Sequence, residues 1–241
     1  MQNFKELIRI AKFGKIADLE ELIDQGANLN QRDQDGKSIL GLVCEIGRID
    51  NAKILIEKGA TFVNCNEKLM TSACGNIGLF VMEALDEGAI VNYVRDFQNE
   101  TPLMIAADQG SLSALKILID NGAELEARNE FGMTALYIAA WLGQPDCLLY
   151  LINAGGNINT LDNWKNTPIA AVCEIEPKWE YAINTLSDER IRALEILLEK
   201  GADPNTKNDE GLTPLDLANQ NYHINAANML KCYNAQKGQY L

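Results

Sequence analysis

The side chains that most often carry catalysis are scarce in this 241-residue sequence. Its one histidine, His223, lies near the C-terminal end. Nucleophilic catalysis needs a serine or cysteine next to a base that exchanges protons near neutral pH, and a histidine is the usual base. No such pair is recognisable around this residue, so the sequence argues against an enzyme and favours a structural role for His223.

Metal and cofactor sites lack their usual ligands. The six cysteines have neither the Cys-x-x-Cys spacing of a zinc site nor that of a redox motif; they are Cys44, Cys65, Cys74, Cys147, Cys173 and Cys232. The acidic residues do not follow the pattern of a calcium-binding loop, and no glycine-rich phosphate loop is present. We therefore expect no metal, no cofactor and free, reduced thiols, with Cys44 and Cys173 in the core.

The charge balance narrows the choice of partner. The sequence has 21 Lys+Arg against 34 Asp+Glu, which gives a net charge of −13. Such a surface repels nucleic-acid phosphates and anionic lipids, and no basic run offsets it. It attracts a basic protein, although a charge of this size also serves simple solubility.

The composition is that of a globular chain, with 47% hydrophobic and 23% charged residues. No apolar run is as long as a membrane-spanning helix, and the segment from Met1 to Glu6 lacks the basic and apolar regions of a signal peptide. We therefore expect a cytoplasmic protein that does not associate with membranes.

Two short motifs recur in step along the chain. The first is a glycine, usually followed by alanine, at intervals of 33, 29, 34, 33 and 46 residues: Gly26, Gly59, Gly88, Gly122, Gly155 and Gly201. The second is a Thr-Pro-Leu-like triplet that starts 12 residues after its glycine, or 13 in one unit: Ser38, Thr101, Thr134, Thr167 and Thr213. Such a period marks a protein built from stacked repeats.

These residue types define a helix pair in each unit. Threonine caps a helix N-terminus, and proline at the next position has the backbone angle that a helix start needs. Glycine after an apolar run supplies the left-handed residue that ends a helix. Between the two motifs lie two short apolar segments, such as Leu136–Leu142 and Cys147–Ile152. A pair of such short helices cannot bury its apolar face alone, so neighbouring units must stack.

The units resemble ankyrin repeats. The family's start and finish motifs match segments such as Thr101–Ala107, Thr134–Ala140, Leu197–Asn205 and Gly211–Leu215. The resemblance covers nearly the whole chain and implies an all-α solenoid of about seven stacked helix-turn-helix units with β-turn or hairpin loops. We expect a single domain, 1–241, with an N-terminal cap at about 1–33, internal repeats at about 34–208 and a C-terminal cap at about 209–241.

The sequence departs from the family pattern in three ways. The family's usual histidine after Thr-Pro-Leu is replaced throughout, which predicts loops that are looser or differently bonded; the residues there are Gly41, Met104, Tyr137, Ala170 and Asp216. The loop after Gly59 is about four residues short, which predicts a stunted loop. An insertion near 176–188 predicts a surface loop, whose Trp179 and Tyr181 either pack on the solenoid or contact a partner.

In the ankyrin family, loop tips and the exposed ends of the first helices form a concave face that binds proteins. At these positions the middle units carry aromatic side chains edged by acidic ones, the composition of a protein-binding hot spot. Alternatively, each ring packs on its own loop or on the next unit. The predicted partner-binding residues are Phe97, Glu100, Asp108, Glu130, Phe131, Met133, Trp141, Leu142, Trp164 and Glu174, together with Trp179 and Tyr181 of the insertion.

The resemblance and the charge together predict a function. We expect a non-enzymatic protein-binding module, monomeric on its own, whose partner has a basic surface. One form of it is an inhibitor or immunity-type protein that masks a cationic enzyme or toxin. The alternative is a scaffold or adaptor, or a bacterial effector that engages host proteins.

Overall fold

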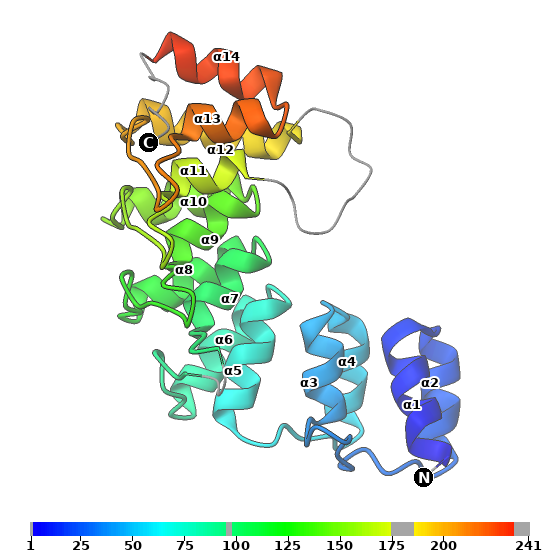
Figure 1. Cartoon of the computed structure of the whole chain (residues 1–241). Coiled ribbons are helices and arrows are strands. Elements are labelled where there is room, and N and C mark those ends of the chain that lie inside the picture. Colours follow the sequence, from blue (N-terminus) through cyan, green and yellow to red (C-terminus); the bar gives the residue numbers. More distant parts are fainter. Residues whose placement is uncertain (1, 95–97, 175–185, 234–241) are drawn as a thin grey trace. The chain divides into compact units, whose positions relative to one another are not determined.

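The computed structural model describes residues 2–94, 98–174 and 186–233, and these residues form fourteen α-helices joined by turns and loops (Figure 1). The all-helical class and the sequential pairing of helices predicted from the repeats are confirmed. The chain divides into two compact units, residues 1–93 with 113–123, and residues 94–112 with 124–241. The single domain predicted for 1–241 stays a prediction.

The first unit is built from two rows of helices. Its helices are α1 (Gln2–Phe13), α2 (Ile16–Asp24), α3 (Ile39–Glu45), α4 (Ile49–Glu57), α5 (Cys65–Cys74), α6 (Gly78–Asp86) and most of α8 (Leu112–Asp120). Helices α1, α3 and α5 pack one on the next, while α2 packs on α1 and α4 on α3. Their fully buried leucines, such as Leu7, Leu19 and Leu55, form the core.

The second unit repeats this arrangement. Its helices are α7 (Pro102–Asp108), α9 (Ala135–Trp141), α10 (Pro145–Asn153), α11 (Pro168–Cys173), α12 (Asp188–Glu199), α13 (Pro214–Gln220) and α14 (Ile224–Cys232). Helices α7, α9, α11 and α13 follow one another in contact, and α10, α12 and α14 form the row behind them. Residues 135–140 of α9 are all buried, because α7, α10 and α11 pack around that helix.

The two recurring motifs begin and end the helices as predicted. The hydroxyl of the Ser or Thr in the triplet accepts a hydrogen bond from the backbone N–H three residues later, at Ser38, Thr101, Thr134, Thr167 and Thr213. The six glycines of the other series have φ between +85° and +100°. An L-residue with a side chain is strained at these angles, which explains why glycine recurs there.

Hairpin-like turns precede four of the first helices. In residues 33–37, 129–133, 162–166 and 208–212, which we call fingers, an Asp or Asn opens the turn, and its Oδ1 accepts backbone hydrogen bonds of 2.8–3.0 Å from the second and fourth residues after it. In the second unit the fingers are also linked by backbone hydrogen bonds of 3.0 Å, Asn163 N–H to Phe131 O and Asp209 N–H to Trp164 O. Local side-chain bonds thus shape each finger, and backbone bonds align it with its neighbour.

Side-chain hydrogen bonds are formed at or beside three of the positions that usually hold the family's histidine. The hydroxyl of Tyr137 donates to Asp162 in the next finger at 2.7 Å, and Asp216 accepts hydrogen bonds from Thr213 of its own helix cap. Next to Gly41, the carboxylate of Glu67 accepts hydrogen bonds from the N–H and hydroxyl of Ser38. The shortened loop after Gly59 leads into α5, so Glu67 comes from a helix rather than from a finger.

All six cysteines lie in the described residues, and none of them forms a disulfide there. Cys44 and Cys173 are fully buried, and burial raises the pKa of each thiol to about 12. They fill the core as small residues. Within the described residues, no helix has both the length and the apolar character to cross a membrane.

Candidate protein-binding surface

Nine of the twelve predicted partner-binding residues are described, and all nine lie in the second unit. Phe97, Trp179 and Tyr181 lie outside the described residues. Phe131, Trp164 and Glu130 are exposed; the partly buried ones are Glu100, Asp108, Met133, Trp141, Leu142 and Glu174. Three of these nine positions are therefore exposed to solvent, and six are only partly exposed.

The rings of Phe131 and Trp164 stack on each other across two fingers. Their centroids are 6.3 Å apart with 20° between the ring planes, while Phe131 remains 39% exposed and Trp164 51% exposed. The amide of Asn163 also donates to the carbonyl of Glu130 at 2.8 Å, which fixes one finger against the other. Each ring therefore packs on the finger of the neighbouring repeat, which was the alternative to contact with a partner. The two rings nevertheless keep an exposed aromatic surface.

A pocket of about 300 Å³ lies beside this aromatic pair. Met133, Trp141, Trp164 and Glu174 of the predicted set line it, together with Asp162, Asn166, Leu217 and the finger residues Asn208, Asp209 and Glu210. Fingers supply most of this lining, and the ends of α9 and α11 supply Trp141 and Glu174. The repeat thus brings residues far apart in the sequence around one hollow.

Asp162 is the hydrogen-bonding centre of this region. Its Oδ2 accepts from the hydroxyl of buried Tyr137 at 2.7 Å, and its Oδ1 accepts from the N–H of Trp164 at 2.9 Å and of Asn166 at 2.8 Å. Burial and the Asp162 carboxylate hold the pKa of Tyr137 well above its ordinary value, so the phenol remains a donor. Asp162 therefore holds the finger with Trp164 against the helix that carries Tyr137.

Glu174 closes the same pocket at the end of α11. Its Oε1 accepts a hydrogen bond of 2.9 Å from the amide of Asn166. Burial raises the pKa of Glu174 to about 7, the carboxylates of Asp162 and Glu210 add to the effect, and the charge of Arg190 opposes it. The pocket thus contains a carboxyl group that is close to half-protonated at neutral pH.

Arg190 anchors the backbone that presents Glu174. It is 1% exposed, and its Nη2 donates to the carbonyl oxygens of Ala171, Val172 and Glu174 at 2.9, 2.7 and 3.0 Å. These carbonyls lie at the C-terminal end of α11, where a helix leaves its last acceptors unpaired. Arg190 therefore fixes the end of α11, and with it the position of Glu174.

The sequence prediction missed Asp162, Tyr137 and Arg190 as parts of this site. A signal for Asp162 was present, since an Asp or Asn stands five residues before each Ser or Thr of the triplet; these residues are Asp33, Asp96, Asn129, Asp162 and Asn208. Such a position indicates a turn that needs a side-chain acceptor. No sequence pattern indicates the role of Arg190, because it depends on three backbone carbonyls brought close by folding.

Five of the nine described residues of the predicted set do not line this pocket: Glu100, Asp108, Glu130, Phe131 and Leu142. The carbonyl of Asp108 accepts a hydrogen bond from the Gln144 side chain at 3.3 Å. Among the described residues, no group of three or more His, Cys, Asp or Glu side chains is arranged to hold a metal ion. The site is therefore an aromatic and carboxylate surface.

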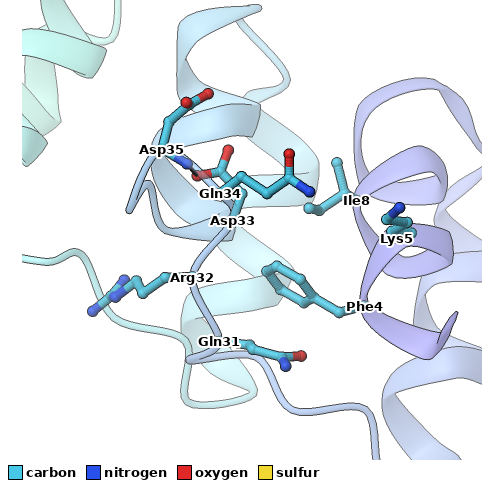
Figure 2. Close-up of a pocket in the computed structure, with 8 residues that line it drawn as sticks. All are labelled: Phe4, Lys5, Ile8, Gln31, Arg32, Asp33, Gln34 and Asp35. Atoms are coloured by element: carbon cyan, nitrogen blue, oxygen red, sulfur yellow. Dashed lines mark hydrogen bonds between the residues drawn. The ribbon is translucent and has the colours of Figure 1, made fainter. Parts of the chain in front are cut away.

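The first unit has a hollow of about 490 Å³ between α1 and the first finger. Figure 2 shows Phe4, Lys5 and Ile8 of α1 on one side and residues 31–35 on the other, with Arg32 pointing away from Phe4. This hollow combines Lys5 with Asp33 and Asp35, so its charges are mixed. It lacks the aromatic stacking of the second unit and is the weaker candidate.

Comparisons with known proteins agree with this architecture. Two protein-family models match the sequence: "Ankyrin repeats (3 copies)" over residues 69–162 and "Ankyrin repeats (many copies)" over residues 180–230. The chain is 30% identical over 202 residues to the human neurogenic locus notch homolog protein 1, an alignment that covers 83% of this chain and 6% of that protein.

Two further relatives match shorter stretches. Alpha-latrocrustotoxin-Lt1a of Latrodectus tredecimguttatus is 33% identical over 144 residues, 59% of this chain and 9% of the toxin. Ankyrin repeat and SOCS box protein 11 of Danio rerio is 32% identical over 117 residues, 48% of this chain and 35% of that protein. The chain therefore spans a small part of the relatives that it matches.

Proposed function

This chain belongs to the ankyrin-repeat family, and from that premise we propose that it is a non-enzymatic module that binds a basic segment of a protein partner. We place the binding surface on the fingers and first helices of the second unit. The observation that carries the proposal is the stacked, exposed pair Phe131 and Trp164 beside a carboxylate-lined pocket.

The aromatic pair supports an interface for an energetic reason. Exposed rings that are already held by a neighbouring ring and by finger hydrogen bonds lose little conformational freedom on binding, so burying them yields most of its hydrophobic gain. Aromatic residues at the centre of an interface carry much of its binding energy. Trp164 and Phe131 therefore act as the anchors in this proposal.

The acidic groups support a basic partner. Asp209 and Glu210 are exposed next to the pocket, and Glu130 is exposed beside Phe131. A net charge of −13 adds a long-range attraction for cationic proteins, which raises the association rate and weakens as salt is added. We propose that the chain acts in this way as a monomer in the cytoplasm.

Affinity capture from native cells tests the proposal. We expect the chain to retain basic proteins at low salt, to retain less of them at physiological salt, and to lose them in the double variant Phe131→Ala/Trp164→Ala. The matched control is Tyr222→Ala/Ile224→Ala, which removes two other exposed apolar side chains of the second unit. Capture that is indifferent to salt, or equal for both double variants, would contradict the proposal.

The captured partner also separates the two forms of this function. An inhibitor or immunity-type protein predicts that the partner is an enzyme or toxin whose activity falls when the chain is added in equimolar amount. A scaffold, adaptor or effector predicts that the partner's activity is unchanged while a further protein joins the complex. The basic preference favours the first form, since catalytic clefts that act on nucleic acid are cationic.

A further inference from the structure

We infer that the pocket beside Trp164 receives one arginine side chain of the partner, held between Trp141 and Trp164 and bonded to Asn166 and Glu174. This inference rests on the proposed function and names the chemical group that the pocket recognises. The residues that carry it line one hollow of about 300 Å³ within the second unit.

The first observation is an unsatisfied acceptor. Asn166 is 6% exposed, and its amide nitrogen donates to Glu174 Oε1 at 2.9 Å and to Asp162 Oδ2 at 3.4 Å. Two carboxylates as partners fix which end of the amide is the nitrogen, so the remaining atom is the carbonyl oxygen. This buried oxygen accepts no hydrogen bond from the described part of the chain. A buried acceptor without a donor is unfavourable, so a ligand that carries N–H groups is favoured there once the Asn166 side chain turns its covered oxygen toward the pocket.

The second observation is the aromatic wall. Phe131 stacks on Trp164 but does not line the pocket, whereas Trp164 does. Trp141 contributes a second indole to the lining. Indole rings attract cations at their faces, with about 0.5–2 kcal/mol of stabilisation depending on exposure.

The first unit already contains a cation held by the same kinds of group. Lys68 is 7% exposed; its Nζ lies 6.0 and 5.8 Å from the ring centroids of Phe62 and Phe80, and 2.9 and 2.8 Å from carboxylate oxygens of Glu83 and Glu87. Two rings and two carboxylates thus surround one basic side chain of this protein. In the second unit, the pocket presents two indoles and several carboxylates to a partner.

Arginine fits this pocket better than lysine because of shape. A guanidinium is planar, stacks on an indole, and presents five N–H donors in directions that reach acceptors on different sides. Lys165 of the same finger is already paired with Asp209 at 2.7 Å, but both side chains are largely exposed. A surface ion pair of this kind contributes about 0–1 kcal/mol, so an incoming arginine can displace it.

The charged state of Glu174 makes the binding dependent on pH. The groups that act on this carboxyl are Asp162, Glu210 and Arg190, and Asn166 bonds to it. Because the pKa of Glu174 is raised to about 7, a proton and an arginine compete for the same carboxylate near neutral pH. Affinity should therefore rise between about pH 6 and pH 8 and level off above that range.

A peptide titration tests the inference. The probes are three blocked pentapeptides, Gly-Ala-X-Ala-Gly, in which X is arginine, lysine or citrulline; citrulline keeps the shape of arginine and removes its charge. The full chain has three tryptophans, and the variants Trp141→Phe and Trp164→Phe assign their indole N–H signals in a nitrogen–proton correlation spectrum. We expect saturable shifts of the Trp141 and Trp164 signals with arginine, at least threefold weaker binding of lysine, and no shift with citrulline.

Two variants, each of which replaces one glutamate by glutamine, complete the test. Glu174→Gln should weaken arginine binding at least fivefold and remove its pH dependence. Glu195→Gln, on the exposed side of α12, should leave both unchanged. The comparison of arginine with citrulline uses the unaltered protein, so the inference remains testable if a variant fails to fold.

The inference is overturned if citrulline binds like arginine, if lysine binds as well as arginine, or if Glu174→Gln binds like the unaltered chain. Failure of the peptide test while partner capture still depends on Phe131 and Trp164 would reject the arginine pocket and keep the proposed function. Loss of that dependence in capture would instead reject the proposed function.

Discussion

The amide of Asn166 donates a hydrogen bond of 2.9 Å to the carboxylate of Glu174, and so connects a finger to the end of a first helix. The same amide also lies 3.4 Å from Asp162, which opens that finger. Displacing either element would leave a buried polar group without its partner, which is costly. The pocket wall is therefore fixed by polar contacts as well as by packing.

The stability of the protein should depend on the protonation of Glu174. Its pKa in the folded protein is raised from 4.5 to about 7, so the folded state holds this proton more tightly than the unfolded state. This contribution is fully present below about pH 4.5 and is lost as the pH rises through about 7. Glu174→Gln, which keeps an acceptor for Asn166, should be more stable than the unaltered chain by roughly 1–2 kcal/mol at about pH 8, after allowance for the partial exposure of the carboxylate.

Urea unfolding at about pH 5 and about pH 8 measures this effect. The two proteins should have nearly equal stability at the lower pH, and Glu195→Gln should show no such change between the two values. Parallel pH profiles for Glu174→Gln and the unaltered chain would contradict the prediction.

Removing the guanidinium of Arg190 should destabilise the second unit strongly. Arg190→Met retains the length of the side chain but removes the side-chain donor to three carbonyl oxygens at the end of α11, of which that of Ala171 keeps the N–H of Glu174 at 3.2 Å. Bonds from a charged donor to buried acceptors make this loss about 3 kcal/mol or more. Arg192→Met, an exposed change on the same helix, should cost less than about 0.5 kcal/mol in the same denaturation experiment.

The phenol of Tyr137 should contribute to the finger that carries Trp164. Tyr137→Phe removes the hydrogen bond of 2.7 Å to Asp162 and leaves a buried carboxylate oxygen short of a donor. We expect a loss of about 1–3 kcal/mol in the free energy of unfolding and faster amide exchange in residues 162–166. Tyr222→Phe, at an exposed position, serves as the control; equal stability of the two variants would refute the role of the phenol.

Lys68 should behave differently from Arg190. For the free energy of unfolding, the charge of the Lys68 side chain should matter less than its shape. Lys68→Met keeps a side chain of similar length beside the rings of Phe62 and Phe80. The carboxylates that lose their partner, Glu83 and Glu87, are about half exposed and remain solvated. We expect a cost below about 1 kcal/mol, because neither remaining carboxylate is buried and ion pairs with solvated carboxylates contribute little. Lys68→Glu should cost at least about 3 kcal/mol, because it adds a third carboxylate to this group. Similar costs for the two variants would contradict this reasoning.

The helix boundaries could be predicted from the sequence because their causes are local. Thr134 caps the residue three positions later, and Gly155 ends the preceding helix through its own backbone angles. Both effects involve a few consecutive residues and recur in each repeat, so the pattern shows them directly.

The chemistry of the pocket could be predicted only in part. Counting along the repeat indicated Trp164 and Glu174 as surface positions, and the structure places both at one pocket. Tyr137 and Asp162 meet across 25 residues, and Arg190 meets Ala171 across 19. Such contacts depend on how side chains interlock between neighbouring repeats, which residue spacing does not specify.

The six glycines that follow the second helices have φ between +85° and +100°, and a Cβ placed on any of them would meet no atom of the described residues within 4 Å. An L-methyl group would thus meet no neighbour at any of these positions, and the backbone angle alone disfavours it. D-alanine adopts these angles without strain, so a chemically synthesised chain with D-alanine at the six positions should keep the fold. It should gain about 0.4–1 kcal/mol per site, because its unfolded state has fewer conformations. The backbone angles at these six positions are those favoured by D-residues. Glycine is the genetically encoded residue that adopts them without strain.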